Sequence, residues 1–182
     1  MKIKFGFYKK FLLFLYALLV FLDWATKFIV KNTFFYGESR EVLGNFFRLT
    51  YVENPYSLFS ISLGKHFPYV WFSLAILFIL FVMFLVENNK WHTFIYTLFM
   101  AGATGNMIDR IKYDRVVDFF DFGLNNHLRW PVFNFADSYI TIGMVLLVLS
   151  IIIDMLKHRK RKNKEEKIVE AEIVENKEQD NE

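Results

Sequence analysis

Residues 102–137 read GATGNMIDRIKYDRVVDFFDFGLNNHLRWPVFNFAD and join two strongly apolar segments of the chain. Charged and polar side chains next to hydrocarbon are energetically expensive, so in a membrane protein they mark a functional site by default. This stretch is crowded with such side chains, namely Asn106, Asp109, Arg110, Asp118, Asn134 and Asp137. The rest of the chain limits what kind of site they can form.

The composition places the chain among membrane proteins. Of its 182 residues, 54% are hydrophobic and 20% are aromatic, and the mean hydropathy is +0.25. These residues are gathered in blocks, whereas a soluble domain distributes them periodically. The absence of cysteine excludes a disulfide framework, a thiolate zinc site and a cysteine nucleophile. The net charge of +3 comes without a basic face interleaved with polar aromatic residues, so no nucleic-acid partner is expected.

Four apolar runs are predicted to be membrane-spanning helices, because about 20 apolar residues cross the hydrocarbon core. They cover about residues 10–30, 67–86, 91–108 and 133–155. The lysine-rich beginning of the chain also resembles a secretory signal peptide. However, the first run continues into Asp23-Trp24-Ala25-Thr26-Lys27 without a small-x-small cleavage site, which favours a retained helix.

The segments between these runs differ in kind. Residues 31–66 mix charges with glycines and contain the β-favouring run Phe46 to Val52, which predicts one or two short strands in an extramembrane subdomain. Residues 112–132 are polar and aromatic and are expected to lie along the membrane interface. Residues 157–182 begin with a basic cluster and continue as a Glu-rich tail, which we expect to be disordered and separate from the domain formed by residues 1–156.

The distribution of lysine and arginine predicts the orientation. Lysines precede the first span, and the basic cluster at residues 157–164 follows the fourth. An even number of spans puts both termini on one side, and the excess of positive charge there indicates the cytoplasm. Residues 31–66 and 112–132 are then expected on the outer side.

Polar groups from three predicted helices converge at one depth. At about 1.5 Å per residue, those of the first and third helices lie roughly 18–27 Å from the cytoplasmic end, and those of the fourth lie in its first turns. Polar residues with scattered structural roles would not be expected to coincide in this way. The residues concerned are Asp23, Lys27, Asn106, Asp109, Asn134 and Asp137.

The spacing of these residues allows two interpretations. Asp23 with Lys27, and Asp109 with Arg110, are placed to form ion pairs that only stabilise helix ends. No basic residue is spaced on a helix face to pair with Asp137, and Asp118 lies in the apolar run VVDFF. Two carboxylates in a half-dry pocket cannot both ionise cheaply, so they would supply one acid and one base around a water molecule, as peptide hydrolysis requires. A proton relay, or helix capping by Asp137, remains the alternative.

Four motifs resemble those of the lipoprotein signal peptidase (signal peptidase II) family. Residues 23–27 are similar to its D-x-x-T-K motif, and residues 105–110 to its G-N-x-x-D-R motif. Residues 116–119 are similar to V-x-D-F, and residues 133–137 to F-N-x-A-D. Each motif is short, but all four occur in order at the membrane positions that the predicted spans require. The resemblance covers most of residues 11–155.

The resemblance implies an all-α membrane fold with four transmembrane helices, a small extracytoplasmic β-cradle at about residues 31–66, and an interfacial lid-like helix or loop at about residues 112–132. It implies an aspartic endopeptidase of the bacterial inner membrane, without metal or cofactor, with Asp118 and Asp137 as the catalytic pair. The residues implied to bind substrate or support the site are Asp23, Lys27, Asn54, Gly102, Asn106, Asp109, Arg110 and Asn134.

The implied substrates are prolipoproteins that carry a diacylglyceryl-modified cysteine, cleaved on the N-terminal side of that cysteine by a monomeric enzyme in contact with membrane lipids. Globomycin-type inhibitors are also implied. One departure concerns the loop asparagine, since Asn54 is followed by Tyr56 where the family has glycine.

Two other classes compete with this interpretation. A Ser/Lys peptidase would use Lys27 with Ser57, Ser60 or Ser138. A proton-coupled transporter would need a midplane site between internal repeats, and neither is visible in the sequence. A presenilin-type protease would need a G-x-G-D motif, which GNMID at residues 105–109 does not match.

Overall fold

The computed structural model describes residues 6–55 and 69–179, with side chains up to residue 163. Its elements are α1 (Phe7–Thr33), β1 (Ser39–Leu43), β2 (Phe47–Asn54), α2 (Tyr69–Val86), α3 (Lys90–Tyr113), β3 (Val116–Phe122) and α4 (Phe135–Gln179). The chain forms two compact units, Met1–Met144 and Val145–Glu182. The first unit holds all the strands, three helices and the first turns of α4, and it contains the candidate site.

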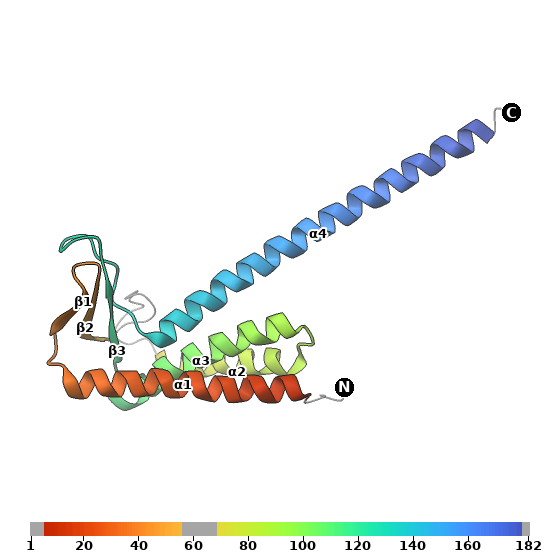
Figure 1. Cartoon of the computed structure of the whole chain (residues 1–182). Coiled ribbons are helices and arrows are strands. Elements are labelled where there is room, and N and C mark those ends of the chain that lie inside the picture. Colours follow the sequence, from red (N-terminus) through yellow and green to blue (C-terminus); the bar gives the residue numbers. More distant parts are fainter. Residues whose placement is uncertain (1–5, 56–68, 180–182) are drawn as a thin grey trace. The chain divides into compact units, whose positions relative to one another are not determined.

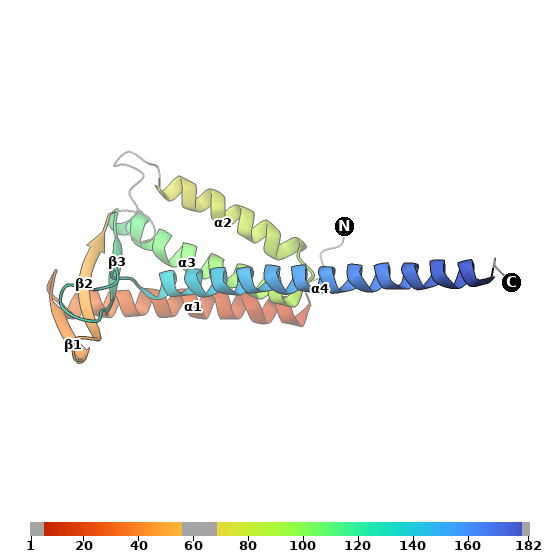
Figure 2. The same cartoon turned by 90° about the horizontal axis from the view of Figure 1, so that it is seen from above.

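Within the first unit, α3 lies between α1 and α2 (Figures 1 and 2). A core of Leu12, Phe84 and Met100 joins the three helices at the end that carries the α2–α3 turn. The turn is closed by Asn89, whose side chain caps α3 by accepting a hydrogen bond of 2.8 Å from the backbone N–H of Trp91.

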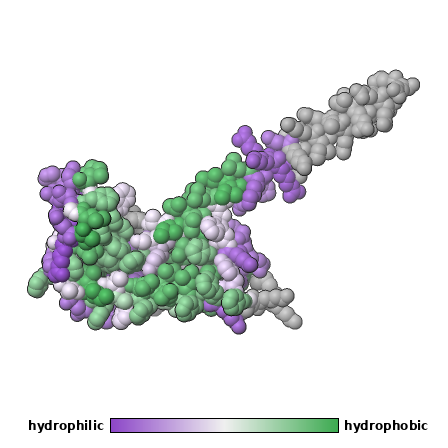
Figure 3. Space-filling model, in the orientation of Figure 1, coloured by the Kyte–Doolittle hydropathy of each residue, from purple (hydrophilic) through white to green (hydrophobic). Residues whose placement is uncertain are grey.

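The helices present an apolar surface of the kind that faces lipid. Among the described residues, α1 and residues 135–163 of α4 are long and apolar enough to cross a membrane, and residues 70–86 form a shorter apolar helix. Figure 3 shows hydrophobic residues covering most of the visible helical surface of the first unit, and hydrophilic residues gathered at its ends. The expected first and third spans correspond to α1 and α3, and the expected beginning of the second, at residue 67, lies outside the described residues.

The sheet is antiparallel with the order β1-β2-β3. The strands expected between residues 31 and 66 are present as β1 and β2, with Arg40 opposite Leu49. Residues 112–132, expected to form a lid-like helix or loop, contain a strand that was not predicted: residues 116–122 form β3, which pairs with β2 so that Asp118 lies opposite Val52. The sheet therefore extends beyond residues 31–66 and takes its third strand from the segment before α4.

Side-chain chemistry explains why residues 116–122 form a strand. The sequence VVDFFDF is rich in β-branched and aromatic residues, which favour the extended conformation once a neighbouring strand and a core are available. Val117 and Phe119 supply one side of a core that also contains Val30 of α1 and Tyr51 of β2. This core attaches the sheet to the end of α1.

The tail of the chain is helical as far as Gln179, where the sequence predicted disorder. Its Lys, Arg and Glu residues favour helix, and no Gly or Pro interrupts them between residues 157 and 179. The division of the chain at residue 156 stays a prediction.

Candidate active site

Two carboxylates and two amides form the centre of the candidate site, at the junction of α3, β3 and α4. Asp118 lies on β3 and Asp137 in the first turn of α4. Asn106 belongs to α3, and Asn134 directly precedes α4. All four side chains are almost completely removed from solvent, with exposed fractions of 6% or less. Buried polar groups require partners, and these four supply them to one another.

The two amides connect the two carboxylates. The Asn134 amide donates a hydrogen bond of 2.6 Å to Asp118 Oδ1, and the Asn106 amide donates one of 2.7 Å to Asp137 Oδ1. Asn134 also donates to Asn106 Oδ1 at 3.1 Å, which completes a continuous path from one carboxylate to the other. The two acids that the sequence predicted to act together therefore belong to one hydrogen-bonded cluster.

Asn134 has a second task as the N-cap of α4. Its side-chain oxygen accepts a hydrogen bond of 2.9 Å from the backbone N–H of Asp137, as a capping residue does at the third helical position. The neighbouring N–H, that of Ala136, donates to Asp23 Oδ1 of α1 at 2.8 Å. The helix that carries Asp137 thus begins at a point set by α1 and by the asparagine that holds Asp118.

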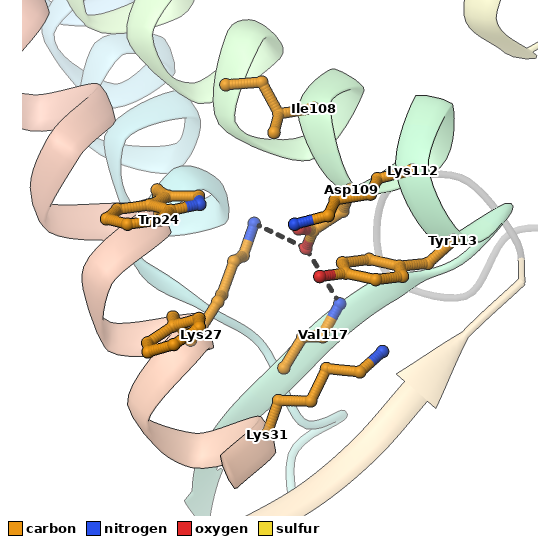
Figure 4. A pocket seen from close by; sticks show the side chains of 9 residues that line it. Trp24, Lys27, Lys31, Ile108, Asp109, Lys112, Tyr113 and Val117 are labelled. Atoms are coloured by element: carbon orange, nitrogen blue, oxygen red, sulfur yellow. Dashed lines mark hydrogen bonds and ion pairs between the residues drawn. The ribbon is translucent and has the colours of Figure 1, made fainter.

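Lys27 is the buried cation of the cluster, with 2% of its surface exposed. Its ammonium lies 2.7 Å from Asp23, 3.3 Å from Asp109 and 2.9 Å from Asn106 Oδ1. Figure 4 shows Lys27 reaching from α1 to Asp109 on α3, and Asp109 in turn accepting from the backbone N–H of Val117 at 3.1 Å. Lys27 and Asp109 therefore connect α1 and α3 to the residue that precedes Asp118.

The predicted Asp23–Lys27 ion pair is confirmed. Asp109, which precedes Arg110 in the sequence, pairs with Lys27 of a different helix. Arg110 lines a groove beside the cluster, together with Asn106. The residues of both expected pairs thus belong to the same site.

Burial raises the pKa of Asp118 to about 7, and the nearby negative charge of Asp137 adds to the increase. Hydrogen bonds from Asn54 and Asn134 and the charge of Lys27 act in the opposite direction without overcoming the desolvation. A carboxyl group in this state holds a proton near neutral pH, which is the condition for a general acid.

Two cavities flank the cluster. One, with a volume of about 310 Å³, opens beside Asp118 and is lined by Val52, Glu53, Asn54, Pro55, Pro131 and Val132. Asn54 donates to Asp118 Oδ2 at 3.2 Å, so this predicted site residue lies in the site. Tyr56, the departure from the family pattern, lies outside the described residues.

The other cavity is an apolar groove of about 320 Å³ between α2, α3 and the first turns of α4. Asn106 and Arg110 supply its polar groups. The remaining lining residues are Phe72, Ser73, Ile76, Leu80, Phe99, Ala103, Ile140 and Met144. An apolar groove with a few polar groups at one position is the usual form of a site for an amphipathic ligand.

Gly102 contributes space between helices. A Cβ at this position would come within 2.4 Å of the carbonyl oxygen of Ala136 on α4. The sequence interpretation did not count Gly105 as a site residue, although its Cβ would come within 2.4 Å of Asp23 Oδ2. Both glycines therefore let α3 approach α4 and Asp23 closely.

One buried acid close to the cluster was also missed. Asp121, two positions beyond Phe119 on the other side of β3 from Asp118, accepts from Arg129 at 2.6 Å and from Thr50 at 2.7 Å. Arg129 also donates to the carbonyl of Asn45, so it fastens the loop after β3 to the β1–β2 hairpin. In a strand, side chains alternate between the two faces, so residues 116–122 place Asp118 and Asp121 on opposite faces. The sequence signal that could have separated the two acids is therefore this alternation.

Other chemistries have less support in the described part of the chain. Ser138 donates its hydroxyl hydrogen to the carbonyl of Asn134, and Lys27 is held by two carboxylates, so the alternative Ser138–Lys27 combination is not assembled. Ser57 and Ser60 lie outside the described residues. In residues 6–55 and 69–163 no group of three or more His, Cys, Asp or Glu side chains is placed to hold a metal ion.

Comparison with known proteins adds independent evidence. The family model described as Signal peptidase (SPase) II matches residues 15–153. The lipoprotein signal peptidase of Cupriavidus necator is 41% identical over 137 residues, covering 72% of this chain and 77% of that protein. The lipoprotein signal peptidase of Nostoc punctiforme is 41% identical over 132 residues, covering 71% and 82% respectively. A solved bacterial membrane enzyme superposes with a TM-score of 0.74 at 30% identity, covering 85% of this chain and 94% of the other.

Proposed function

Because the chain belongs to the signal peptidase II family of membrane aspartic peptidases, which has lipoprotein signal peptidase activity, we propose that it cleaves diacylglyceryl-modified prolipoproteins on the N-terminal side of the lipidated cysteine. We propose Asp118 and Asp137 as the catalytic pair. The observation that carries this assignment is the continuous path of hydrogen bonds from Asp118 through Asn134 and Asn106 to Asp137.

The mechanism proposed for the pair divides acid and base roles between two coupled carboxyl groups. One is ionised and takes a proton from a water molecule, which attacks the scissile carbonyl carbon. The other is protonated and donates its proton to the carbonyl oxygen. When the tetrahedral intermediate breaks down, the second group takes this proton back, and the first group passes the proton that it took from water to the departing amine. The raised pKa of Asp118, to which burial and then the charge of Asp137 contribute, supports a proton on this carboxyl group near neutral pH.

Asn106, Asn134, Lys27, Asp23 and Asp109 are proposed as positioning residues. The amides orient the carboxylates by donating to them, and the Lys27 ammonium compensates the negative charge of the buried acids. Gly102 helps to position these groups because it has no side chain and so lets α3 pack closely against α4. These roles need precise placement, which the caps and ion pairs of rigid helices supply.

The two cavities suggest where a lipidated precursor lies. The apolar groove between α2, α3 and α4 suits acyl chains or the apolar signal segment, with Arg110 and Asn106 close to the polar part of the substrate. The cavity beside Asp118 and Asn54 suits the peptide near the scissile bond. Globomycin-type inhibitors would compete for the same space. Cleavage by a monomer stays a prediction.

For orientation we propose four spans formed by α1, α2, α3 and the apolar part of α4, in the bacterial inner membrane. Both termini are placed in the cytoplasm by the basic residues next to the first and fourth helices. The sheet and the catalytic pair then lie near the outer face, and the sheet with the segment after β3 forms the extracytoplasmic cradle.

The proposal is tested by incubating purified protein with a diacylglyceryl-modified precursor and with the same precursor left unmodified. We expect mass spectrometry to detect cleavage before the cysteine only in the modified precursor. Asp118→Asn and Asp137→Asn should each abolish the product while the protein still unfolds cooperatively. Asp114→Asn is the matched control, because Asp114 is exposed and its left-handed backbone conformation, with φ of 56°, is one that asparagine tolerates. Near-normal turnover by either variant of the pair would exclude the assignment.

A further inference from the structure

A second group of cationic and aromatic side chains lies between α1 and the last turns of α3 (Figure 4). Lys31, Lys112, Tyr113, Trp24 and Phe28 line a small pocket there. Its inner wall is formed by Lys27, Asp109, Ile108 and Val117. The cavity has a volume of only about 10 Å³, space for about one water molecule, so a larger ligand would be held at the rim.

The rim of this pocket is positively charged. The Lys31 ammonium lies 3.6 Å from the centre of the Tyr113 ring, and the Lys112 ammonium lies 5.1 Å from it, so two cations flank one aromatic ring. Lys31 also pairs with Glu53 at 3.1 Å, and Arg115 lies 3.7 Å from the same carboxylate.

The cations at the rim outnumber the carboxylates that pair with them. Glu53 is shared by Lys31 and Arg115. Among the described residues Lys112 forms no ion pair, and its ammonium lies against the Tyr113 ring. These cations can attract an anion that approaches from outside.

An exposed aromatic stripe leads along α1 to this charge. Phe21, Trp24, Phe28 and Lys31 follow one another at intervals of three, four and three residues, which places them on one face of the helix. The rings of Phe21 and Trp24 are 5.9 Å apart, and those of Trp24 and Phe28 are 5.6 Å apart and stacked. Between 42% and 57% of each aromatic residue is exposed. The helix thus offers a continuous apolar track that ends in a cation.

We propose that this surface binds one anionic glycerophospholipid, with the phosphate between Lys31 and Lys112 and one acyl chain along Phe28, Trp24 and Phe21. Basic pockets between membrane helices bind lipid head groups, and tryptophan favours the boundary between head groups and hydrocarbon. The cations at the rim favour a head group with net negative charge over a zwitterionic one. The site is separate from the proposed catalytic pair, and its existence does not depend on which residues carry out cleavage.

Native mass spectrometry of the full chain in detergent tests the proposal, with dioleoyl phosphatidylglycerol as the probe. We expect Lys31→Gln and Lys112→Gln each to weaken binding of the first lipid by about fivefold, as expected for one lysine near a lipid surface. Arg40→Gln is the matched control, since it removes an exposed cation from β1 and should leave binding unchanged. Lys31→Arg keeps the charge and should retain binding, which separates a lost contact from a folding defect.

Two further measurements test whether the site binds the phosphate of a lipid or free inorganic phosphate. Phe28→Ala should weaken binding of both phosphatidylglycerol and phosphatidylcholine, because it shortens the acyl track. Inorganic phosphate at millimolar concentration should not displace the lipid. Unchanged lipid affinity in both lysine variants, an equal loss in Arg40→Gln, or efficient displacement by inorganic phosphate would each overturn the proposal.

Discussion

The side chain of Asn134 donates a hydrogen bond of 2.6 Å to Asp118 and at the same time caps the helix that carries Asp137. One residue therefore sets the position of both acids, one through its amide nitrogen and the other through its amide oxygen. This arrangement ties the geometry of the pair to the point at which α4 begins. It also makes the two tasks of Asn134 separable by mutation.

Asn134→Ala removes the cap and the donor together, whereas Asn134→Ser keeps a good capping residue but loses the donor to Asp118. We expect Asn134→Ala to be less stable than Asn134→Ser by about 1 kcal/mol, the usual value of a helix cap. Both variants should lose about 10- to 100-fold in cleavage rate, because loss of the donor leaves a buried oxygen of Asp118 without this hydrogen bond, which typically costs about 1–3 kcal/mol. Unfolding and turnover are measured side by side, with Asn126→Ser as control. Equal stability of the two variants would contradict the capping role.

Lys27→Met should destabilise the protein strongly. It leaves Asp23 and Asp109 buried without their cation, and breaking a buried pair in this way typically costs about 3–5 kcal/mol. Thermal unfolding in detergent measures the effect. Lys10→Met, which removes an exposed lysine from the same helix, is the control and should unfold like the unmodified protein. A Lys27→Met variant of full stability would show that the buried acids are compensated by other groups.

Gly105→Ala tests the close approach of α3 to Asp23. The added methyl group would lie 2.4 Å from Asp23 Oδ2 and 3.1 Å from the Cβ of Ala136, so one of the helices must shift. Overpacking of this kind typically costs about 1–3 kcal/mol, and here it also displaces the carboxylate that caps α4. We expect lower thermal stability together with reduced cleavage. Gly6→Ala, where a Cβ meets nothing within 4 Å, should change neither.

The raised pKa of Asp118 predicts how stability depends on pH. The unfolded chain releases this proton at about pH 4, while the folded protein keeps it to about pH 7. Between these values the folded state binds more protons than the unfolded state, so the free energy of unfolding should fall as the pH rises. The side chain in Asp118→Asn cannot titrate, so the variant's free energy of unfolding, measured with denaturant at several pH values, should change less with pH across this range. An identical pH dependence in the variant would rule out a proton on Asp118.

The cleavage rate should depend on the same titration of Asp118. If Asp118 supplies the acid of the pair, the cleavage rate should decline above about pH 7, where the carboxyl group ionises. The decline is measured with a lipidated precursor at fixed detergent concentration, and Asp114→Asn should share the profile of the unmodified protein. A rate that keeps rising well above pH 7 would assign the acid role elsewhere.

The sequence predicted the helices and the convergence of polar groups, because hydropathy and helical rise depend only on local composition and length. It also predicted the Asp23–Lys27 pair, since both residues lie on one helix. The contacts of Lys27 with Asp109 and Asn106 could not be predicted in this way, because spacing rules relate residues on one helix and say nothing about its neighbours.

The strand β3 was missed for a related reason. Val116 to Phe122 alternates as a strand should, but its partner β2 comes before two helices, so no hairpin signal connects them. Short apolar runs are ambiguous until a partner is known, and the aromatic content of this one also suited a membrane interface. Sequence reasoning therefore identified Asp118 but did not predict the strand that carries it.

The late position of β3 and Asn134 in the chain has a consequence for biogenesis. The sheet is complete only when residues 116–122 reach β2, and Asp118 gains the hydrogen bond from Asn134 only when the segment before α4 is present. Contacts between such distant segments form late, because the intervening chain must first be ordered. A nascent polypeptide that ends before residue 134 would contain Asp118 but neither Asn134 nor Asp137, so on the proposed assignment it would not cleave until the beginning of α4 has been added.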